Sequence, residues 1–281
     1  MNTNRGKFST SIASAAALAT ALGVTGPVAA ADDLMSQIEE RGELRVCHAE
    51  DNPLTFRNPA TNKWEGLTRD LAAAFAEDLG VELVDVDSSW KSIIPSVQSG
   101  ECDLGGGGLF VTVTRAKVVL FSIPFMFAHS SAVVHVDSGL TSYEQLDQPD
   151  KLVIGVAGTS TLEFAKKFFK KATVKALTST SDAVTLAEIA NKRADAYWTN
   201  SYRGAKLLKE NPQFKSRLIG DVPQDYVSTS WAIRKGEYHF KQVVDVWLHR
   251  FITAGKVEEL WKKWYGPDLP YVRGDWRRTI K

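Results

Sequence analysis

The residues best suited to binding a charged group lie just after a run of four glycines, Gly105–Gly108. Because glycine has no side chain, such a run lets the backbone approach another group closely. Thr112 can begin a turn of helix with free backbone N–H groups, and Arg115 follows three residues later. A guanidinium binds a carboxylate through two parallel hydrogen bonds, so this spacing suits a carboxylate ligand. A glycine-rich strand end beside a solvated surface arginine would give the same spacing, and the spacing alone does not separate the two interpretations.

A second group of candidate residues opens a predicted helix at Gly158-Thr159-Ser160-Thr161. A predicted strand, 152–156, comes directly before it, and the helix is expected to run to about Lys171. Hydroxyl side chains and unpaired N–H groups at a helix N-terminus attract anions. These residues therefore form a second site at which a negatively charged ligand could be held.

The elements that must position these residues alternate along the chain. Leu67, Leu71, Phe75 and Leu79 recur every four residues, which is typical of one buried helix face, and Gly80 is expected to end that helix. Strands are predicted at 43–48, 81–86, 102–105, 132–136, 152–156, 174–177, 194–199 and 228–234, and helices at 34–41, 67–79, 90–99, 158–171, 181–191, 202–210, 239–254 and 257–265. This alternation indicates an α/β fold with parallel sheets.

Residues 1–31 have the pattern of a cleavable secretory signal. Arg5 and Lys7 form a basic start, and the alanine-rich run Ile12–Val24 is shorter than the roughly 20 strongly apolar residues of a membrane-spanning helix. Cleavage is expected after Ala31. The remaining chain has 32 of the 34 basic residues and all 33 acidic ones, a formal charge of −1, which does not favour binding to nucleic acid.

The mature chain of about 250 residues suits two lobes of ordinary domain size. The first lobe is predicted to comprise 32–128 and 227–281, and the second to comprise 129–226. The chain crosses between them in short extended segments, near 127–130 and 227–228, which favours hinges over flexible tethers.

The only two cysteines are Cys47 and Cys102. In an oxidising compartment two cysteines suggest one disulfide. However, Cys47 lies late in its predicted strand and Cys102 at the very start of a neighbouring one, an offset that could exceed the reach of a bridge. Both possibilities stay open, and without a C-x-x-C or H-x-x-H pair a metal site is not expected.

Motifs in a fixed order extend over most of residues 40–266. They are Leu44-Arg45-Val46; Gly66-Leu67-Thr68-Arg69-Asp70-Leu71-Ala72; Trp90 with Ile94-Pro95-Ser96; Thr112-x-x-Arg115 followed by Phe121-Ser122-x-Pro124-Phe125; and Gly158-Thr159-Ser160 with Ala194-Asp195-Ala196. In this order the chain resembles the family 3 extracytoplasmic solute-binding proteins, the polar amino-acid receptors of ABC importers. The resemblance implies a two-lobed type II periplasmic binding fold, each lobe a mostly parallel sheet flanked by helices.

The resemblance also implies a ligand site. Arg115 would hold the ligand carboxylate, helped by backbone N–H groups near Phe110 and by Thr159 and Ser160 of the opposite lobe. Trp90 takes the place of an aromatic that packs on the ligand. Gly107 and Gly108 occupy the strand edge where ligand groups meet backbone carbonyls.

Two positions depart from the family's pattern. Where the family commonly has an aspartate that binds the ligand ammonium, this chain has Asn200, which carries no charge. The first loop, Glu50–Leu54, is one residue shorter and lacks the usual aromatic. Asp51 or Glu50 could supply the missing negative charge, although a solvated loop acid is slightly favoured. The ligand is therefore expected to be a small carboxylate that could lack a free amine.

The implied function is ligand-induced closure and amino-acid transport by a periplasmic monomer that delivers its ligand to a membrane ABC permease, with no cofactor and no catalysis. A cyclohexadienyl-dehydratase-like enzyme, which would eliminate water from arogenate or prephenate, is one alternative. At the position where such a dehydratase has its acidic residue, this chain has Arg203, so the general acid is absent. Another alternative is an accessory binding protein of a periplasmic quinoprotein dehydrogenase, which Leu44–Cys47 and Cys102-Asp103 resemble. The retained Arg115 argues against that role, which needs no carboxylate clamp.

Remaining polar and aromatic residues have weaker claims to the site. The five histidines are scattered without metal-ligand spacing, and only His48, at a strand end, is a candidate ligand contact. Most tryptophans are expected in the core. Trp198, at the end of a predicted strand, could line the pocket.

Overall fold

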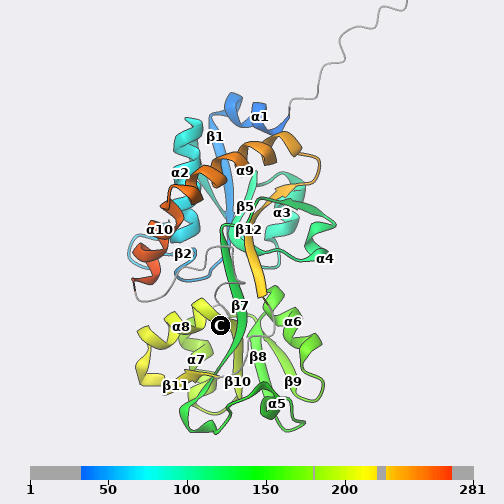
Figure 1. Cartoon of the computed structure of the whole chain (residues 1–281), viewed down its shortest axis with the longest axis vertical. Coiled ribbons are helices and arrows are strands. Elements are labelled where there is room, and N and C mark those ends of the chain that lie inside the picture. Colours follow the sequence, from blue (N-terminus) through cyan, green and yellow to red (C-terminus); the bar gives the residue numbers. More distant parts are fainter. Residues whose placement is uncertain (1–32, 180, 220–225, 268–281) are drawn as a thin grey trace, which may run out of the picture. The chain divides into compact units, whose positions relative to one another are not determined.

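The described residues, 33–179, 181–219 and 226–267, all belong to one compact unit, Asp32–Lys281, in a computed structural model of the chain. Their strands form a mixed sheet in the order β4-β1-β5-β12-β7-β10-β8-β9 (Figure 1). The order is symmetric about its middle. Each half has three parallel strands and one antiparallel strand that joins it to the other half. The predicted signal sequence, 1–31, lies outside the described residues.

The first half contains the parallel strands β4-β1-β5, with Val46 of β1 beside Leu104 of β5. Its strands are β1 (Glu43–His48), β4 (Glu82–Asp87) and β5 (Leu104–Phe110), and its helices are α1 (Leu34–Arg41), α2 (Leu67–Leu79), α3 (Ile93–Ser99), α4 (Val113–Ala116), α9 (Tyr238–Thr253) and α10 (Lys256–Tyr265). Leu67, Leu71 and Phe75 of α2 are fully buried, as their spacing predicts, and Gly80 ends the helix in the left-handed conformation.

The second half repeats this arrangement in the order β10-β8-β9. Its strands are β8 (Leu152–Val156), β9 (Thr173–Leu177) and β10 (Ala196–Asn200), and its helices are α5 (Tyr143–Leu146), α6 (Ser160–Phe168), α7 (Asp182–Ala190) and α8 (Ser201–Glu210). Both halves have buried apolar clusters of their own, one around Phe75 and Trp231 and another around Trp198. This is the two-lobed α/β arrangement that the sequence predicts.

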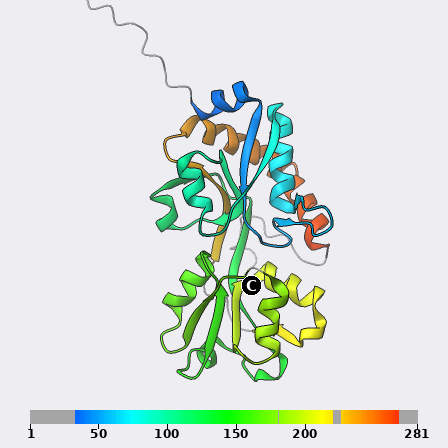
Figure 2. The same ribbon diagram turned by 180° about the vertical axis from the view of Figure 1, so that it is seen from behind.

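Two long antiparallel strands join the lobes, β7 (Met126–His135) and β12 (Tyr226–Arg234). They pair with each other from Tyr226 beside His129 to Thr229 beside Met126. The same pairing is visible from behind in Figure 2, where the orange and green strands of the crossing lie side by side. The predicted crossings fall on these paired segments. The exact lobe boundaries stay a prediction.

Several element boundaries differ from the expectation. The sequence does not predict four short strands, which are β2 (Phe56–Arg57), β3 (Trp64–Glu65), β6 (Val119–Phe121) and β11 (Ser216–Leu218). Helix α6 ends at Phe168, three residues before the predicted Lys171, because the Asp147 carboxylate accepts hydrogen bonds from the backbone N–H groups of 170–172. Among the described residues, no helix combines the length and the apolar character needed to cross a membrane.

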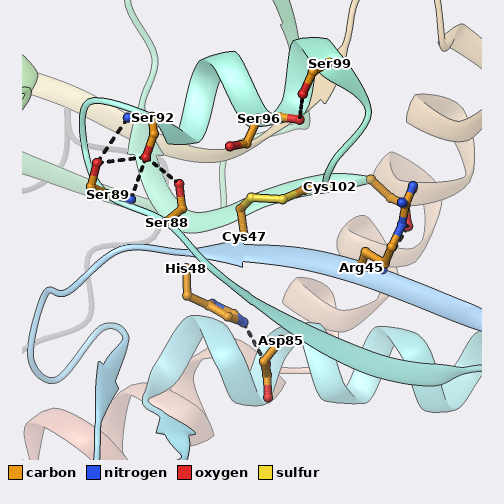
Figure 3. The surroundings of a disulfide bond; sticks show 11 residues. Arg45, Cys47, His48, Asp85, Ser88, Ser89, Ser92, Ser96, Ser99 and Cys102 are labelled. Carbon is orange, nitrogen blue, oxygen red and sulfur yellow. Dashed lines mark hydrogen bonds and ion pairs between the residues drawn. A yellow bond between two sulfur atoms is a disulfide. The ribbon is translucent and has the colours of Figure 1, made fainter.

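Cys47 and Cys102 form a disulfide with Cα atoms 5.7 Å apart (Figure 3). The expected offset between them does not arise, because β5 begins at Leu104 rather than at Cys102. Cys102 lies instead in the turn between α3 and β5, close to Cys47 of β1. Both cysteines are buried, at 0% and 1% exposure, so the bridge is part of the first lobe's core.

We predict that replacing both cysteines with alanine lowers the free energy of unfolding by about 4 kcal/mol, because the bridge closes a loop with a sequence separation of 55 residues in the unfolded chain. Urea unfolding followed by circular dichroism measures the change. Ser99→Ala, at an exposed position near the bridge, is the matched control. Equal stability of the double variant and the control would contradict a structural role for the bridge.

Candidate functional site

A cavity lies between the lobes and receives side chains from both. The first lobe contributes Asp51, Trp90, Gly108, Phe110 and Arg115; the second contributes Val156, Thr159, Ser160, Thr161, Tyr197, Trp198, Thr199, Asn200, Tyr202 and Arg203. All the predicted ligand-binding residues except Gly107 are among them.

Arg115 is held by backbone carbonyls of both lobes. Its Nη1 donates to the Phe110 carbonyl at 3.0 Å and its Nη2 to the Gly158 carbonyl at 3.4 Å. Thr112 caps α4 by accepting a hydrogen bond from the Arg115 backbone N–H, as the T-x-x-R spacing predicts. Phe110 therefore contacts Arg115 through its carbonyl, whereas its N–H group was the expected ligand contact.

The charge of Arg115 has no counterpart in the described part of the chain, where no carboxylate pairs with it. Burial without a compensating anion lowers the pKa of its guanidinium to about 10. The guanidinium remains a cation at neutral pH. It is a desolvated positive charge that an anion entering the cavity would neutralise.

The N-terminus of α6 faces the same cavity from the second lobe. The Thr159 hydroxyl accepts a hydrogen bond from the Leu162 N–H at 3.2 Å and donates to the Val156 carbonyl at 2.7 Å. The bond from Leu162 caps α6 and the bond to Val156 ties the hydroxyl to the end of β8, which leaves Ser160 as the better placed hydroxyl for a ligand. A Cβ on Gly158 would lie 2.9 Å from the backbone of Trp90, so only glycine permits this close approach between the lobes.

Gly107 differs from the expectation, since it does not line the cavity. A Cβ at Gly107 would lie 3.4 Å from the Trp90 ring, so the indole covers this part of β5. Trp90 itself is fixed by a hydrogen bond from its Nε1 to the Glu50 carbonyl at 3.1 Å. The strand edge that remains at the cavity is Gly108.

Arg203 is the main residue of the cavity that the sequence interpretation missed. It is 4% exposed, and its Nη1 donates to Asp51 Oδ1 at 3.0 Å while its Nη2 donates to Asp182 Oδ1 at 2.8 Å. Asp51 belongs to the first lobe and Asp182 begins α7 of the second. A buried cation thus holds carboxylates from both lobes. Asp51 is 6% exposed, so the slightly favoured expectation of a solvated loop acid is wrong.

One signal in the sequence could have identified Arg203. It lies in the first turn of α8, where the helix dipole disfavours a positive charge. A cation at such a position needs a strong local reason. Asn200 caps the same helix, its side-chain oxygen accepting a hydrogen bond from the Arg203 backbone N–H at 2.8 Å.

The two members of the ion pair between the lobes respond differently to burial. Burial raises the pKa of Asp51 to about 6, although the charge of Arg203 opposes this. Burial would lower the pKa of Arg203, but Tyr197, Asp51 and Asp182 raise it above its ordinary value. Arg203 is therefore always charged, and Asp51 is the member of the pair that titrates.

Two further candidates have different outcomes. Trp198 lines the cavity, as one interpretation allowed, and it is 1% exposed. His48 is not among the lining residues. Its Nε2 pairs with Asp85 Oδ1 at 2.8 Å and its ring is fully buried, so it stabilises the first lobe rather than contacting the cavity (Figure 3).

We predict that Asp51→Asn removes part of the pH dependence of stability. Because the folded-state pKa of Asp51 lies above its ordinary value, the folded protein binds the extra proton between about pH 4 and pH 6, and this contribution to stability is lost as the pH rises through about 6. As the pH rises from about 4 to about 6, the melting temperature of the wild type should therefore fall relative to that of Asp51→Asn. Parallel curves for the two proteins would contradict the raised pKa.

Comparison with known proteins gives consistent matches over most of the chain. A family model described as bacterial extracellular solute-binding proteins, family 3, matches residues 44–267. Cyclohexadienyl dehydratase of Pseudomonas aeruginosa is 24% identical over 257 residues, covering 90% of this chain and 94% of that protein. The ABC transporter glutamine-binding protein of Bacillus subtilis is 25% identical over 220 residues, covering 76% of this chain and 77% of the relative.

A solved structure has the same fold. The ancestral amino acid-binding protein that is a precursor of cyclohexadienyl dehydratase is 30% identical and superposes with a TM-score of 0.75, over 83% of this chain and 99% of the ancestral one.

Proposed function

The chain belongs to the bacterial extracellular solute-binding proteins of family 3, and from this membership we propose that it is a periplasmic receptor that closes on a small carboxylate-bearing ligand and delivers it to an ABC permease. The ligand is an amino acid or a related compound. Relatives that bind glutamine, and glutamate or aspartate, support this proposal. The predicted signal sequence supports a location outside the cytoplasm.

The observation that carries the proposal is the unpaired charge of Arg115. Burying a cation without an anion costs free energy, and a ligand carboxylate would recover that cost through two charge-assisted hydrogen bonds. The N–H groups at the start of α6 lie on the other side of the same cavity and favour negative charge. A carboxylate held there would contact both lobes at once, and contacts made in the closed state alone favour closure.

We predict that Arg115→Ala weakens carboxylate binding by at least about tenfold, since a charge-assisted hydrogen bond to an ionised group contributes about 1.5–3 kcal/mol. Arg115→Lys keeps the charge but loses the paired donors. Its affinity for the carboxylate should lie between those of the wild type and Arg115→Ala. Isothermal titration calorimetry with a carboxylate found in a thermal-shift screen measures both affinities. Arg193→Ala, an exposed arginine paired with Glu188, is the matched control. Unchanged affinity in Arg115→Ala would disprove the clamp.

The second candidate function is a dehydratase, which the relative from Pseudomonas aeruginosa favours. Eliminating water requires an acid that can protonate the leaving hydroxyl. Asp51 is the one carboxylate among the described residues that line the cavity. Although burial raises its pKa to about 6, its Oδ1 is occupied by the hydrogen bond from Arg203 Nη1. We therefore propose binding without catalysis.

We predict that incubation with prephenate or arogenate gives no aromatic product. Product formation is followed by the ultraviolet absorbance of phenylpyruvate and phenylalanine, with the protein at a concentration comparable to the substrate. Asp51→Asn is the control, because a product that forms in the wild type and disappears in this variant would show Asp51 acting as the acid. That outcome would replace the receptor proposal with an enzyme.

A further inference from the structure

We propose that the ligand of this cavity is a carboxylate without an ammonium group, whose second polar group is a hydrogen-bond acceptor, as in a 2-oxo or 2-hydroxy acid. This inference rests on the proposed function, a receptor whose Arg115 holds the ligand carboxylate. It concerns the other end of the ligand. There the cavity offers the Asn200 amide as a hydrogen-bond donor, and its carboxylate, Asp51, is already paired with Arg203.

The first reason is that the place of a ligand cation is already occupied by the chain. Asp51 is the one carboxylate among the described lining residues, and Arg203 Nη1 donates to it at 3.0 Å. Asp182 holds the other side of the same guanidinium at 2.8 Å. An ammonium that approached Asp51 Oδ1 would have to compete with a guanidinium that is tethered to the fold and cannot diffuse away.

The second reason is the orientation of the Asn200 amide. Its oxygen accepts a hydrogen bond from the Arg203 backbone N–H at 2.8 Å, which fixes that atom as the cap of α8. The same side chain lines the cavity, so the atom left for a ligand is the NH₂ group. An NH₂ group can only donate. It therefore suits a carbonyl or hydroxyl oxygen and repels an ammonium.

The test compares matched pairs of acids by isothermal titration calorimetry on the full mature protein. The pairs are 2-oxoglutarate and L-glutamate, phenylpyruvate and L-phenylalanine, and 4-methyl-2-oxopentanoate and L-leucine. In any pair that binds, the oxo acid should bind at least about tenfold tighter than its amino acid. An amino acid that binds as tightly as its oxo acid, or tighter, would overturn the inference and leave the carboxylate receptor intact.

Asn200→Asp is the diagnostic variant. Aspartate is as good a helix cap as asparagine, so α8 is expected to stay folded. The change replaces a donor with a negatively charged acceptor, and should shift the ratio of affinities by at least about tenfold toward the amino acid. A role in capping alone would leave this ratio unchanged, and that result would also overturn the inference.

Arg115→Ala separates this inference from the proposed function. If no acid of any pair binds the wild type, or if binding is the same in Arg115→Ala, then the carboxylate site itself is wrong and both proposals fail. If Arg115→Ala abolishes binding while the oxo and amino acids of each pair bind equally to the wild type, only the inference fails.

Discussion

A buried guanidinium must be paired, and in this protein the pairing of Arg203 spans the two lobes. Its partners, Asp51 and Asp182, come from opposite lobes and are 131 residues apart in the chain. Breaking a buried pair leaves an uncompensated charge and costs several kcal/mol, far more than losing an exposed one. The loop after β1 and the starts of α7 and α8 are therefore constrained to meet at one point, and the cavity is built around that point.

The two arginines of the cavity differ in their hydrogen-bond partners. Arg203 has carboxylates on both sides, whereas Arg115 has only backbone carbonyls in the described part of the chain. Arg203 is buried and held by carboxylates, whereas Arg115 is partly buried and desolvated without one among the described residues, so Arg115 is the cation that an incoming anion can neutralise. The contrast assigns roles within the cavity, since Arg203 organises the protein and Arg115 is available to a ligand.

Much of the fold follows from local patterns that the sequence displays. The stripe on α2 repeats at helical spacing and ends at a glycine, and Thr112 lies three residues before Arg115, so neither depends on distant residues. The length of β7 is different. Ser130 and Ser131 interrupt its apolar pattern, yet they are buried because they pair with Asn200 and Thr199 of β10. Only the tertiary structure makes that segment a strand.

Some residues of the candidate site can likewise be identified from local sequence motifs, whereas others depend on tertiary contacts. Arg115, Thr159 and Asn200 could be identified because each begins or follows a local motif. The position of Arg203 in the first turn of a helix signals an unusual cation, but its partner could not be identified, since Asp51 is 152 residues away and no spacing rule connects them. The disulfide also depended on a boundary that the sequence does not define, because Cys102 precedes β5 by two residues instead of starting it.

The most direct test of the central claim is a crystal structure of the protein with its tightest-binding carboxylate. The ligand carboxylate should lie within about 3 Å of both terminal nitrogens of Arg115, with the ion pair between Asp51 and Arg203 intact beside it. A carboxylate bound to Arg203 instead, with Arg115 still bonded only to the Phe110 and Gly158 carbonyls, would contradict the account.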